Sequence, residues 1–434
     1  MSPERNGLRR RTVLTALGVA GAGSLVGSAS ASDATEDDSD GDRSVGDGET
    51  DSAESNDVSS SFVSRGTDRI EKLFESHLEQ GLHPGAQLAV YHEGELVVDL
   101  AGGTTGADGE GVTTDSRFLL FSCTKPYAAA CVHQLADRGT LDFDDRLVEH
   151  WPTFAEEGTQ KAEVTIRQML SHQAGMPAVA VDEEYDSWND PDALAAGIEE
   201  ADLDFSPGET AEYHTLSFGW LVGELVRQVT GQQIDEYARE EIFDPLEMCR
   251  TSIGIPKEEP NDVATLVGFE PYDGSDSDPS IGSTTEEVAA LFNEESVLRA
   301  VVPGANGIGP ARELARFYAC YLNGGEFDGT RLFDSETTEE AAAVQVEVPP
   351  GSGEPVSSGQ RYGLGFQLGG ALPDRYGIGV PSTTYGHAGL GSSISWADPE
   401  SGIAFAYVTN GIRDDYEHNA RIAAMGETVR NELA

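Results

Sequence analysis

Lysine is scarce in this chain. Its 27 basic residues include four lysines, Lys72, Lys125, Lys161 and Lys257, and the other 23 are arginines. Positive charge is scarce as well, because 77 acidic residues bring the formal net charge to −50 at pH 7. Such a charge repels itself in dilute buffer, whereas molar salt shortens the screening length to roughly 3 Å. The composition therefore predicts adaptation to high salt, and it argues against nucleic acid or anionic membranes as partners.

The acidity is not confined to one tail. Residues 32–61 carry a net charge of −10 and residues 1–31 a net charge of +3, so −43 remains on residues 62–434. Residues 32–61 are so polar and charged that they cannot bury enough surface to offset the entropy of ordering. We therefore expect a disordered acidic linker over 32–61 and a folded domain over 62–434.

Long apolar runs are missing too. The mildly apolar run that follows Arg9, Arg10 and Arg11 is too short and too rich in glycine and alanine for a membrane span. It ends in the small residues Ala29-Ser30-Ala31, which are typical of a cleavage site. Residues 1–31 therefore predict a signal peptide, most simply of the twin-arginine type, with an ordinary secretory signal as the alternative. We expect a secreted, extracellular protein with no integral span after signal removal.

Metal-binding and redox motifs are absent from the sequence. The four cysteines, Cys123, Cys131, Cys249 and Cys320, contain no C-x-x-C pair, and the nine histidines form no H-E-x-x-H motif. On one helix Cys123 and Cys131 would lie about 12 Å apart, too far for a disulfide. We predict no structural metal and no cofactor. G-x-S-x-G is also missing, which excludes the nucleophile turn of α/β-hydrolases.

The two ends of the folded part have similar patterns. Residues 68–80 have helical spacing, and "AQLAVYHEGELVVDLAGG" predicts two strands around a turn at Glu93-Gly94. Near the other end we expect strands at 392–397 and 403–409, then a closing helix at 414–432. The middle is mainly helical. The pattern predicts an α/β fold of the α+β kind, in which an antiparallel sheet is built from both chain ends, flanked by helices, with a mainly helical subdomain inserted.

Lys125 in "FSCTKP" (121–126) is unusual in a chain whose basic residues are mostly arginine, because an arginine would supply positive charge equally well. Pro126 is tolerated only in the first turn of a helix, so a helix should begin close to Ser122. Ser122 and Lys125 would then share a face, beside the unpaired N–H groups of the helix start. A buried amine there can lose its proton and accept the serine's proton, which an arginine cannot do. S-x-x-K alone also fits a capped, exposed helix start.

Five further segments accompany this motif. At this point the sequence resembles the serine β-lactamase and penicillin-binding protein superfamily, especially class C β-lactamase-like enzymes, family VIII carboxylesterases and D-stereospecific peptidases. The resemblance covers nearly all of residues 68–430. It rests, in order, on "FSCTKP", "VTIRQMLSHQAGMP", "SPGETAEYHTLSFGWLVGELV", "GPARELARFYA", "YGLGFQL" and "YGHAGLGSSISWADPESGIAFAYVTN". It implies a β-lactamase-like serine hydrolase domain over 62–434.

The resemblance implies roles for particular residues. Ser122 matches the nucleophile, Lys125 a general base, and Tyr213 the tyrosine that shuttles protons to the leaving group. The third motif is His387-Ala388-Gly389, in which the glycine would let a substrate lie along the strand. The N–H groups of Ser122 and Leu390 would form the oxyanion hole. Tyr213 as a core aromatic and His387 as a strand-edge histidine remain alternatives.

Two departures from the family pattern affect the choice of substrate. Thr215 stands where an asparagine usually contacts the substrate amide, and His387 stands where most β-lactamases have a lysine that holds a β-lactam carboxylate. Both favour a carboxylesterase that acts on a small-molecule ester or amide. A β-lactamase or D-amino-acid peptidase is the alternative, and a non-catalytic penicillin-binding-like module is a rival of another class. The sequence makes no prediction of oligomeric state.

Other conspicuous residues have structural explanations. We expect His172 to be a cap or packing residue at a helix end. Phe218 and Trp220 fall at helical apolar positions and should pack in the core. Cys123 lies beside Ser122, and we expect a small buried residue there, not a second nucleophile.

Overall fold

The computed structural model describes residues 59–63, 67–106, 109–270, 284–349, 359–371, 374, 376–377, 380–413 and 415–433. The predicted signal peptide and almost all of the predicted linker lie outside these residues. None of the described helices is both long enough and apolar enough to cross a membrane.

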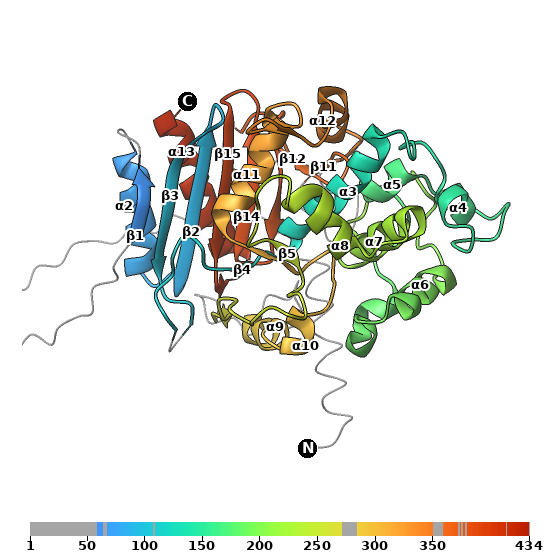
Figure 1. The fold of residues 1–434 in the computed structure, drawn as a ribbon, viewed down its shortest axis with the longest axis horizontal. Helices are drawn as coiled ribbons and strands as arrows, with labels where there is room; N and C mark the ends of the chain where they lie inside the picture. The colour runs from blue at the N-terminus through green and yellow to red at the C-terminus, as the bar shows by residue number, and fades with distance from the viewer. Residues whose placement is uncertain are drawn as a thin grey trace, which may run out of the picture.

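A nine-stranded antiparallel sheet dominates the described part, in the order β1-β3-β2-β15-β14-β13-β12-β11-β10. Its strands are β1 Ser59–Val63, β2 Gly85–His92, β3 Glu95–Gly103, β10 Val346–Val348, β11 Gln360–Tyr362, β12 Gln367–Leu368, β13 Tyr385–Gly389, β14 Ser393–Asp398 and β15 Ile403–Thr409. Near its middle β2 pairs with β15, for example Ala89 with Ala406. Figure 1 shows these N-terminal and C-terminal strands side by side. The predicted sheet built from both chain ends is confirmed.

Helices cover both faces of the sheet. On one face α2 Asp68–Glu79 and α13 Asp415–Leu433 pack on large side chains such as Leu88 and Phe405. On the other face lies α11 Ala311–Leu322, over small residues such as Ala89 and Ala406. Because successive side chains of a strand point to opposite faces, strands buried on both sides are apolar throughout. This explains the continuous apolar run in β15.

The inserted middle is mainly helical, as predicted, and Figure 1 shows α3 to α8 grouped beside the sheet. The helices are α3 Lys125–Asp137, α4 Leu147–His150, α5 Ile166–Leu170, α6 Pro191–Glu200, α7 Ser217–Thr230, α8 Ile234–Ala238, α9 Thr285–Phe292, α10 Glu295–Leu298 and α12 Ser335–Ala342. Shorter helical turns are η1 Ser122–Thr124, η2 Lys161–Glu163, η3 Ala180–Glu183, η4 Tyr185–Ser187 and η5 Arg239–Phe243. Small strands are β4 Phe118–Leu119, β5 Ser252–Ile253, β6 Val267–Gly268, β7 Gly307–Gly309, β8 Glu326–Phe327, β9 Thr330–Arg331 and β16 Gly411–Ile412.

One predicted boundary is wrong. We expected the disordered linker to extend to residue 61, but β1 begins at Ser59 and pairs with β3 in antiparallel register, with Ser60 opposite Leu100. The serines of β1 have little intrinsic tendency to form a strand. However, β3 would otherwise present a row of unpaired backbone groups at the sheet edge. Pairing with that edge therefore decides the conformation here, and composition does not reveal it.

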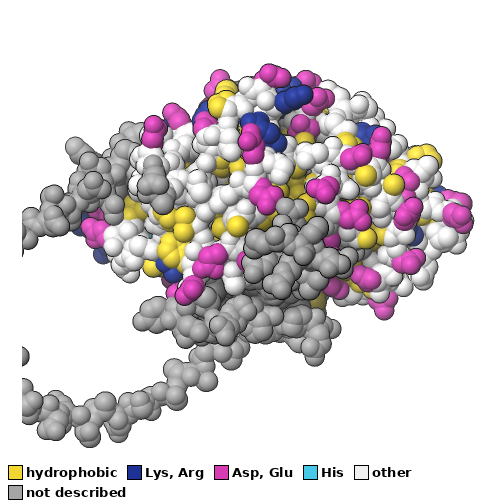
Figure 2. Space-filling view, turned by 90° about the horizontal axis from the view of Figure 1, so that it is seen from below, with side chains coloured by type: hydrophobic (Ala, Val, Ile, Leu, Met, Phe, Trp, Pro, Cys, Tyr) yellow, Lys and Arg dark blue, Asp and Glu magenta, His cyan; other side chains and the backbone are white. Residues whose placement is uncertain are grey.

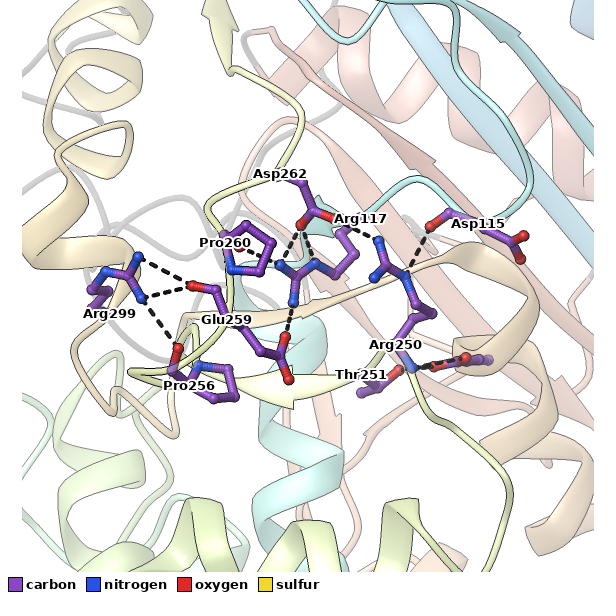
Figure 3. Close-up of polar contacts among 10 residues, drawn as sticks. Asp115, Arg117, Arg250, Thr251, Pro256, Glu259, Pro260, Asp262 and Arg299 are labelled. Carbon is purple, nitrogen blue, oxygen red and sulfur yellow. Dashed lines mark hydrogen bonds and ion pairs between the residues drawn. The ribbon is translucent and has the colours of Figure 1, made fainter.

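A buried arginine fixes the chain just before β4. The side chain of Arg117 is 1% exposed, and its Nη1 lies 2.6 Å from Glu259 Oε2 while its Nε lies 2.5 Å from Asp262 Oδ1. Asp262 also accepts a hydrogen bond of 2.7 Å from Arg250. Figure 3 shows the Arg117 guanidinium between these two carboxylates. Since β4 leads directly to Ser122, this network anchors the approach to the nucleophile position.

Acidic side chains are spread over the folded domain. Figure 2 shows them scattered across one face, with few Lys or Arg side chains among them. This distribution agrees with the sequence count, which placed most of the negative charge on residues 62–434.

Candidate active site

The chain turns sharply at the predicted nucleophile. Phe121 has φ 46° and ψ −133°, a conformation that L-residues seldom adopt and that commonly marks functional sites. The turn η1 begins at Ser122 and continues into α3, with Pro126 in the first turn of that helix. The predicted helix start is confirmed. Packing of the Phe121 ring against Phe292, with centroids 5.0 Å apart, helps to hold the turn.

Lys125 contacts the serine, and its side chain is completely buried. Its Nζ lies 3.2 Å from Ser122 Oγ and donates to the carbonyl of Gly304 at 2.8 Å. Burial lowers the pKa of Lys125 to about 7, although Cys123 and Asp182 act in the opposite direction. A substantial fraction of the amine is therefore neutral near pH 7 and can accept a proton.

Tyr213 and His387 complete the cluster. Lys125 Nζ lies 4.9 Å from the centroid of the Tyr213 ring, and the rings of Tyr213 and His387 are 5.9 Å apart. His387 is on β13, and its Nδ1 donates to the carbonyl of Ala388 at 2.8 Å. The fold thus brings together side chains from α3, from the segment before α7, and from the sheet.

The end of β13 and the start of β14 pack tightly against the nucleophile turn. Ser393 Oγ donates to the carbonyl of Leu120 at 2.8 Å, and Cys123 Sγ donates to the carbonyl of His387 at 3.1 Å. A methyl group on Gly389 would lie 2.5 Å from the Leu120 oxygen and would also overlap Ser393 Oγ. Glycine is therefore required here by the packing of strand against turn, a reason that the sequence did not reveal. Leu390 follows directly and is 9% exposed.

Comparison with known proteins identifies the family. The family model described as Beta-lactamase matches residues 70–429. This chain belongs to the beta-lactamase family. It is 34% identical over 351 residues to the esterase/beta-lactamase LipL of Mycobacterium tuberculosis, which covers 75% of this chain and 77% of LipL.

Solved structures agree with the family assignment. A family VIII carboxylesterase superposes with a TM-score of 0.73 at 27% identity, covering 86% of this chain and 99% of that one. A penicillin-binding protein homologue from Caulobacter crescentus superposes with a TM-score of 0.71 at 30% identity, covering 86% of this chain and all of the other. The predicted fold class is confirmed.

In this beta-lactamase-family site, the backbone of Thr215 lies beside Gly304, the residue whose carbonyl accepts from Lys125. A methyl group on Gly304 would lie 3.0 Å from the Thr215 carbonyl oxygen. The Thr215 N–H donates to the carbonyl of Pro177 at 3.4 Å, and the residue is 8% exposed. The backbone of Thr215 is therefore next to the residue that binds Lys125.

Two neutral histidines hold the segment that carries Tyr213. The N–H of His214 donates to Nδ1 of His172 at 3.1 Å, and the N–H of Met176 donates to Nε2 of His214 at 3.1 Å. His172 also packs on Tyr213, with ring centroids 4.9 Å apart. Its expected role as a packing residue is confirmed, but its hydrogen bond was not foreseen. In the sequence, "SHQ" contains His172 and "YHT" places His214 directly after Tyr213. These positions near motif residues are the one sequence signal that could have suggested that the two histidines interact.

Stability should fall as the pH decreases below about 6.5. Burial lowers the pKa of His214 from 6.5 to about 4 and that of His172 well below 6.5. As the pH falls, the histidines of the unfolded chain therefore take up protons at a higher pH than those of the folded protein. Stability is lost as the pH falls from about 6.5 to about 4. For His214 alone the loss is about 3 kcal/mol. Chemical unfolding at several pH values in constant molar KCl measures this loss in the free energy of unfolding.

The matched variant is His214→Gln, which offers an acceptor to the Met176 N–H and does not titrate. It should show a shallower fall in the free energy of unfolding over the same pH range. An equally steep fall in both proteins would contradict the assignment to His214.

Asp182 is a site neighbour that sequence reasoning missed. It is 7% exposed. Its carboxylate accepts one hydrogen bond of 2.8 Å from the indole N–H of Trp220 and another of 3.0 Å from the backbone N–H of Val179. Burial raises its pKa to about 7, and it interacts electrostatically with Lys125. In a chain with 77 acidic residues nothing marks this one as buried. The expected core positions of Trp220 and Phe218 are confirmed.

Cys123 should not react as a nucleophile. All four cysteines are free thiols, but Cys123 is buried and burial raises its pKa to about 11, whereas Cys249 is exposed. Because the thiolate is the reactive form, brief alkylation of the native protein should label Cys249 alone. Peptide mass mapping checks this, with the unfolded protein as the control in which all four are labelled. Labelling of Cys123 in the native protein would contradict the expectation.

Within the described ranges, no group of three or more His, Cys, Asp or Glu side chains is arranged to hold a metal ion.

Proposed function

We propose that this protein is a serine hydrolase that acts on small carboxylic esters through an acyl-enzyme. The observation that carries the proposal is the contact of 3.2 Å between Ser122 Oγ and the Nζ of a fully buried lysine whose pKa is about 7. A neutral amine at this distance is a suitable base for the serine.

In the proposed mechanism Ser122 Oγ attacks the ester carbonyl carbon and gives its proton to Lys125. Tyr213 helps to pass a proton to the leaving alkoxide, which departs as the alcohol. The N–H groups of Ser122 and Leu390 stabilise the oxyanion, and each such donor is typically worth about 3 kcal/mol. Water then attacks the acyl-enzyme, releases the carboxylic acid and restores the serine.

Esters are favoured over β-lactams for two reasons. His387 stands in place of a lysine and does not supply a permanent charge for a β-lactam carboxylate. Thr215 stands in place of an asparagine that would contact an amide. The similarity to LipL and to a family VIII carboxylesterase supports an esterase. The second candidate is turnover of a β-lactam or a D-peptide, which the similarity to a penicillin-binding protein homologue supports.

We further propose that the protein is exported and adapted to high salt. Consecutive arginines at Arg9, Arg10 and Arg11 before an apolar run support export by a twin-arginine-type signal. The net charge of −50 supports function at molar salt, where the repulsion is screened.

A direct test uses the purified protein in molar KCl with p-nitrophenyl butyrate and, separately, a chromogenic cephalosporin. We expect turnover of the ester, little cleavage of the cephalosporin, and loss of ester turnover in Ser122→Ala. Efficient cephalosporin turnover would assign the protein to the β-lactamases. A stable mass adduct without turnover would instead support a penicillin-binding role. A folded protein that reacts with neither compound would refute the proposal.

A further inference from the structure

Arg421 is a buried arginine on α13, the last helix on one face of the sheet. The residue is 3% exposed. Burial lowers its pKa to about 10, so the guanidinium still carries its charge at pH 7. A buried charge is costly unless its donors find acceptors. The acceptors of Arg421 therefore indicate what the residue does.

Among the described residues, Arg421 binds mainly backbone carbonyls. Its Nη2 donates to the carbonyl of Gly391 at 2.6 Å and to that of Gly411 at 2.9 Å, and its Nη1 donates to the carbonyl of Leu82 at 3.0 Å. The other described acceptors are uncharged side-chain atoms, namely Thr409 Oγ1, His83 Nδ1 and His418 Nδ1. In a chain with 77 acidic residues, this set of partners indicates that Arg421 fixes backbone positions.

The shortest of these contacts holds the turn between β13 and β14. Gly391 lies in that turn directly after Leu390, whose N–H is the proposed oxyanion donor, and only the backbone of these two residues separates the N–H from the bound carbonyl. Gly391 has φ 57°, and a side chain there would overlap the carbonyl oxygen of Arg413. The backbone N–H of Arg413 also donates to the Gly391 carbonyl, at 3.0 Å. Two donors from the chain after β15 therefore hold this carbonyl.

The residues on either side of Leu390 and Gly391 are fixed as well. Before them, Gly389 packs closely on the carbonyl of Leu120. After them, the carbonyl of Ser392 accepts a hydrogen bond of 2.9 Å from Thr409 Oγ1. The Leu390 N–H can therefore keep one direction while charge develops on a substrate. Donors that need not reorient stabilise an oxyanion best.

We propose that Arg421 is a positioning residue that fixes the turn carrying Leu390. It acts through the Gly391 carbonyl and not through contact with the substrate. The inference rests on the proposed ester hydrolysis, in which the Leu390 N–H stabilises the oxyanion. Removal of an oxyanion donor costs roughly 10²–10³-fold in kcat. Because the Arg413 N–H would still hold Gly391, we expect a smaller loss, of about ten-fold, when the Arg421 contact is removed.

A boronic acid tests the oxyanion contact. Ser122 Oγ adds to the boron of butaneboronic acid and gives its proton to Lys125, and the tetrahedral boronate then places an oxygen where the oxyanion would lie. With p-nitrophenyl butyrate as substrate in molar KCl, Arg421→Gln should raise the inhibition constant about ten-fold. Its kcat should fall by a similar factor, with KM little changed. A loss of folded protein alone would lower kcat and leave the inhibition constant at the parental value, and that result would overturn the inference.

Arg430→Gln is the matched control, because Arg430 is a mostly buried arginine on the same helix. It binds the other end of the sheet layer, donating to the carbonyl of Tyr376 at 2.9 Å and lying 3.5 Å from Asp398. This variant should lose stability and keep the parental inhibition constant. An inhibition constant raised equally in Arg430→Gln and Arg421→Gln would also overturn the inference.

Arg421→Lys keeps the charge and a donor, so it should fold more readily than Arg421→Gln and retain part of the affinity for the boronate. If Arg421→Gln does not fold, Arg421→Lys decides by the same inhibition constant. A parent protein that does not hydrolyse the ester would refute the proposed function, and this inference with it. An active parent and folded Arg421 variants with the parental inhibition constant would refute this inference alone.

Discussion

Lys125→Arg should lower kcat/KM for p-nitrophenyl butyrate by about 10³-fold, because a guanidinium keeps its proton and cannot take one from Ser122. In the parent protein kcat/KM should rise with pH through about 7, as the buried amine becomes neutral. The variant should lose this rise together with its activity. Initial rates from pH 5.5 to 9 in molar KCl measure both effects.

The same substitution at Lys72 is the control, since Lys72 is exposed on α2. Lys72→Arg should leave the rate and its pH profile unchanged. A folded Lys125→Arg protein that retains the parental activity would show that the position supplies only charge, and the general-base assignment would be wrong.

Gly219→Ala should lower both stability and ester turnover. A methyl group on Gly219 would overlap the backbone of Gly304, whose Cα would be 2.8 Å away. The backbones of Gly219 and Gly304 cannot rotate away from this overlap as a side chain could. Helix α7 must therefore move away from the segment that carries the Gly304 carbonyl. That carbonyl accepts from Lys125, so the base should be displaced. We expect a loss of about 1–3 kcal/mol in the free energy of unfolding, as for other overpacked sites.

Gly223→Ala, one turn further along α7, provides the matched control. Its added methyl group would have ordinary contacts of 3.4 Å with Ile234 and Pro303. Alanine is favoured over glycine in a helix by about 1 kcal/mol, so this variant should be as stable as the parent or more stable. Urea unfolding and ester kinetics on both variants distinguish the steric effect from helix propensity. Equal stability of the two variants would contradict the steric explanation.

The features predicted correctly from the sequence are those set by neighbouring residues. The spacing of Ser122, Lys125 and Pro126 determines that the serine starts a helix and that the lysine lies one turn away. The turn at Glu93-Gly94 and the strands β14 and β15 also follow from local patterns. Tyr213 and His387 were assigned through resemblance to a family, because nothing local connects them to Ser122.

The features missed depend on contacts between distant parts of the chain. Lys125 binds the carbonyl of Gly304, 179 positions away, and any residue type can supply a carbonyl. Asp182 differs from the surface acids only in being buried. The requirement for Gly389 arises where Leu120 meets the sheet. Such constraints depend on packing, and only the folded structure reveals them.

The pairing of β2 with β15 has a consequence for the order of events during synthesis. Ala89 and Ala406 are 317 residues apart, and contacts so distant in sequence slow folding because a long loop must close first. The middle of the sheet cannot form until nearly the whole chain has left the ribosome. The nucleophile turn, which packs on β13, must wait for the same event. Activity should therefore appear only after translation is complete, and a chain that ends before β15 should have neither sheet nor active site.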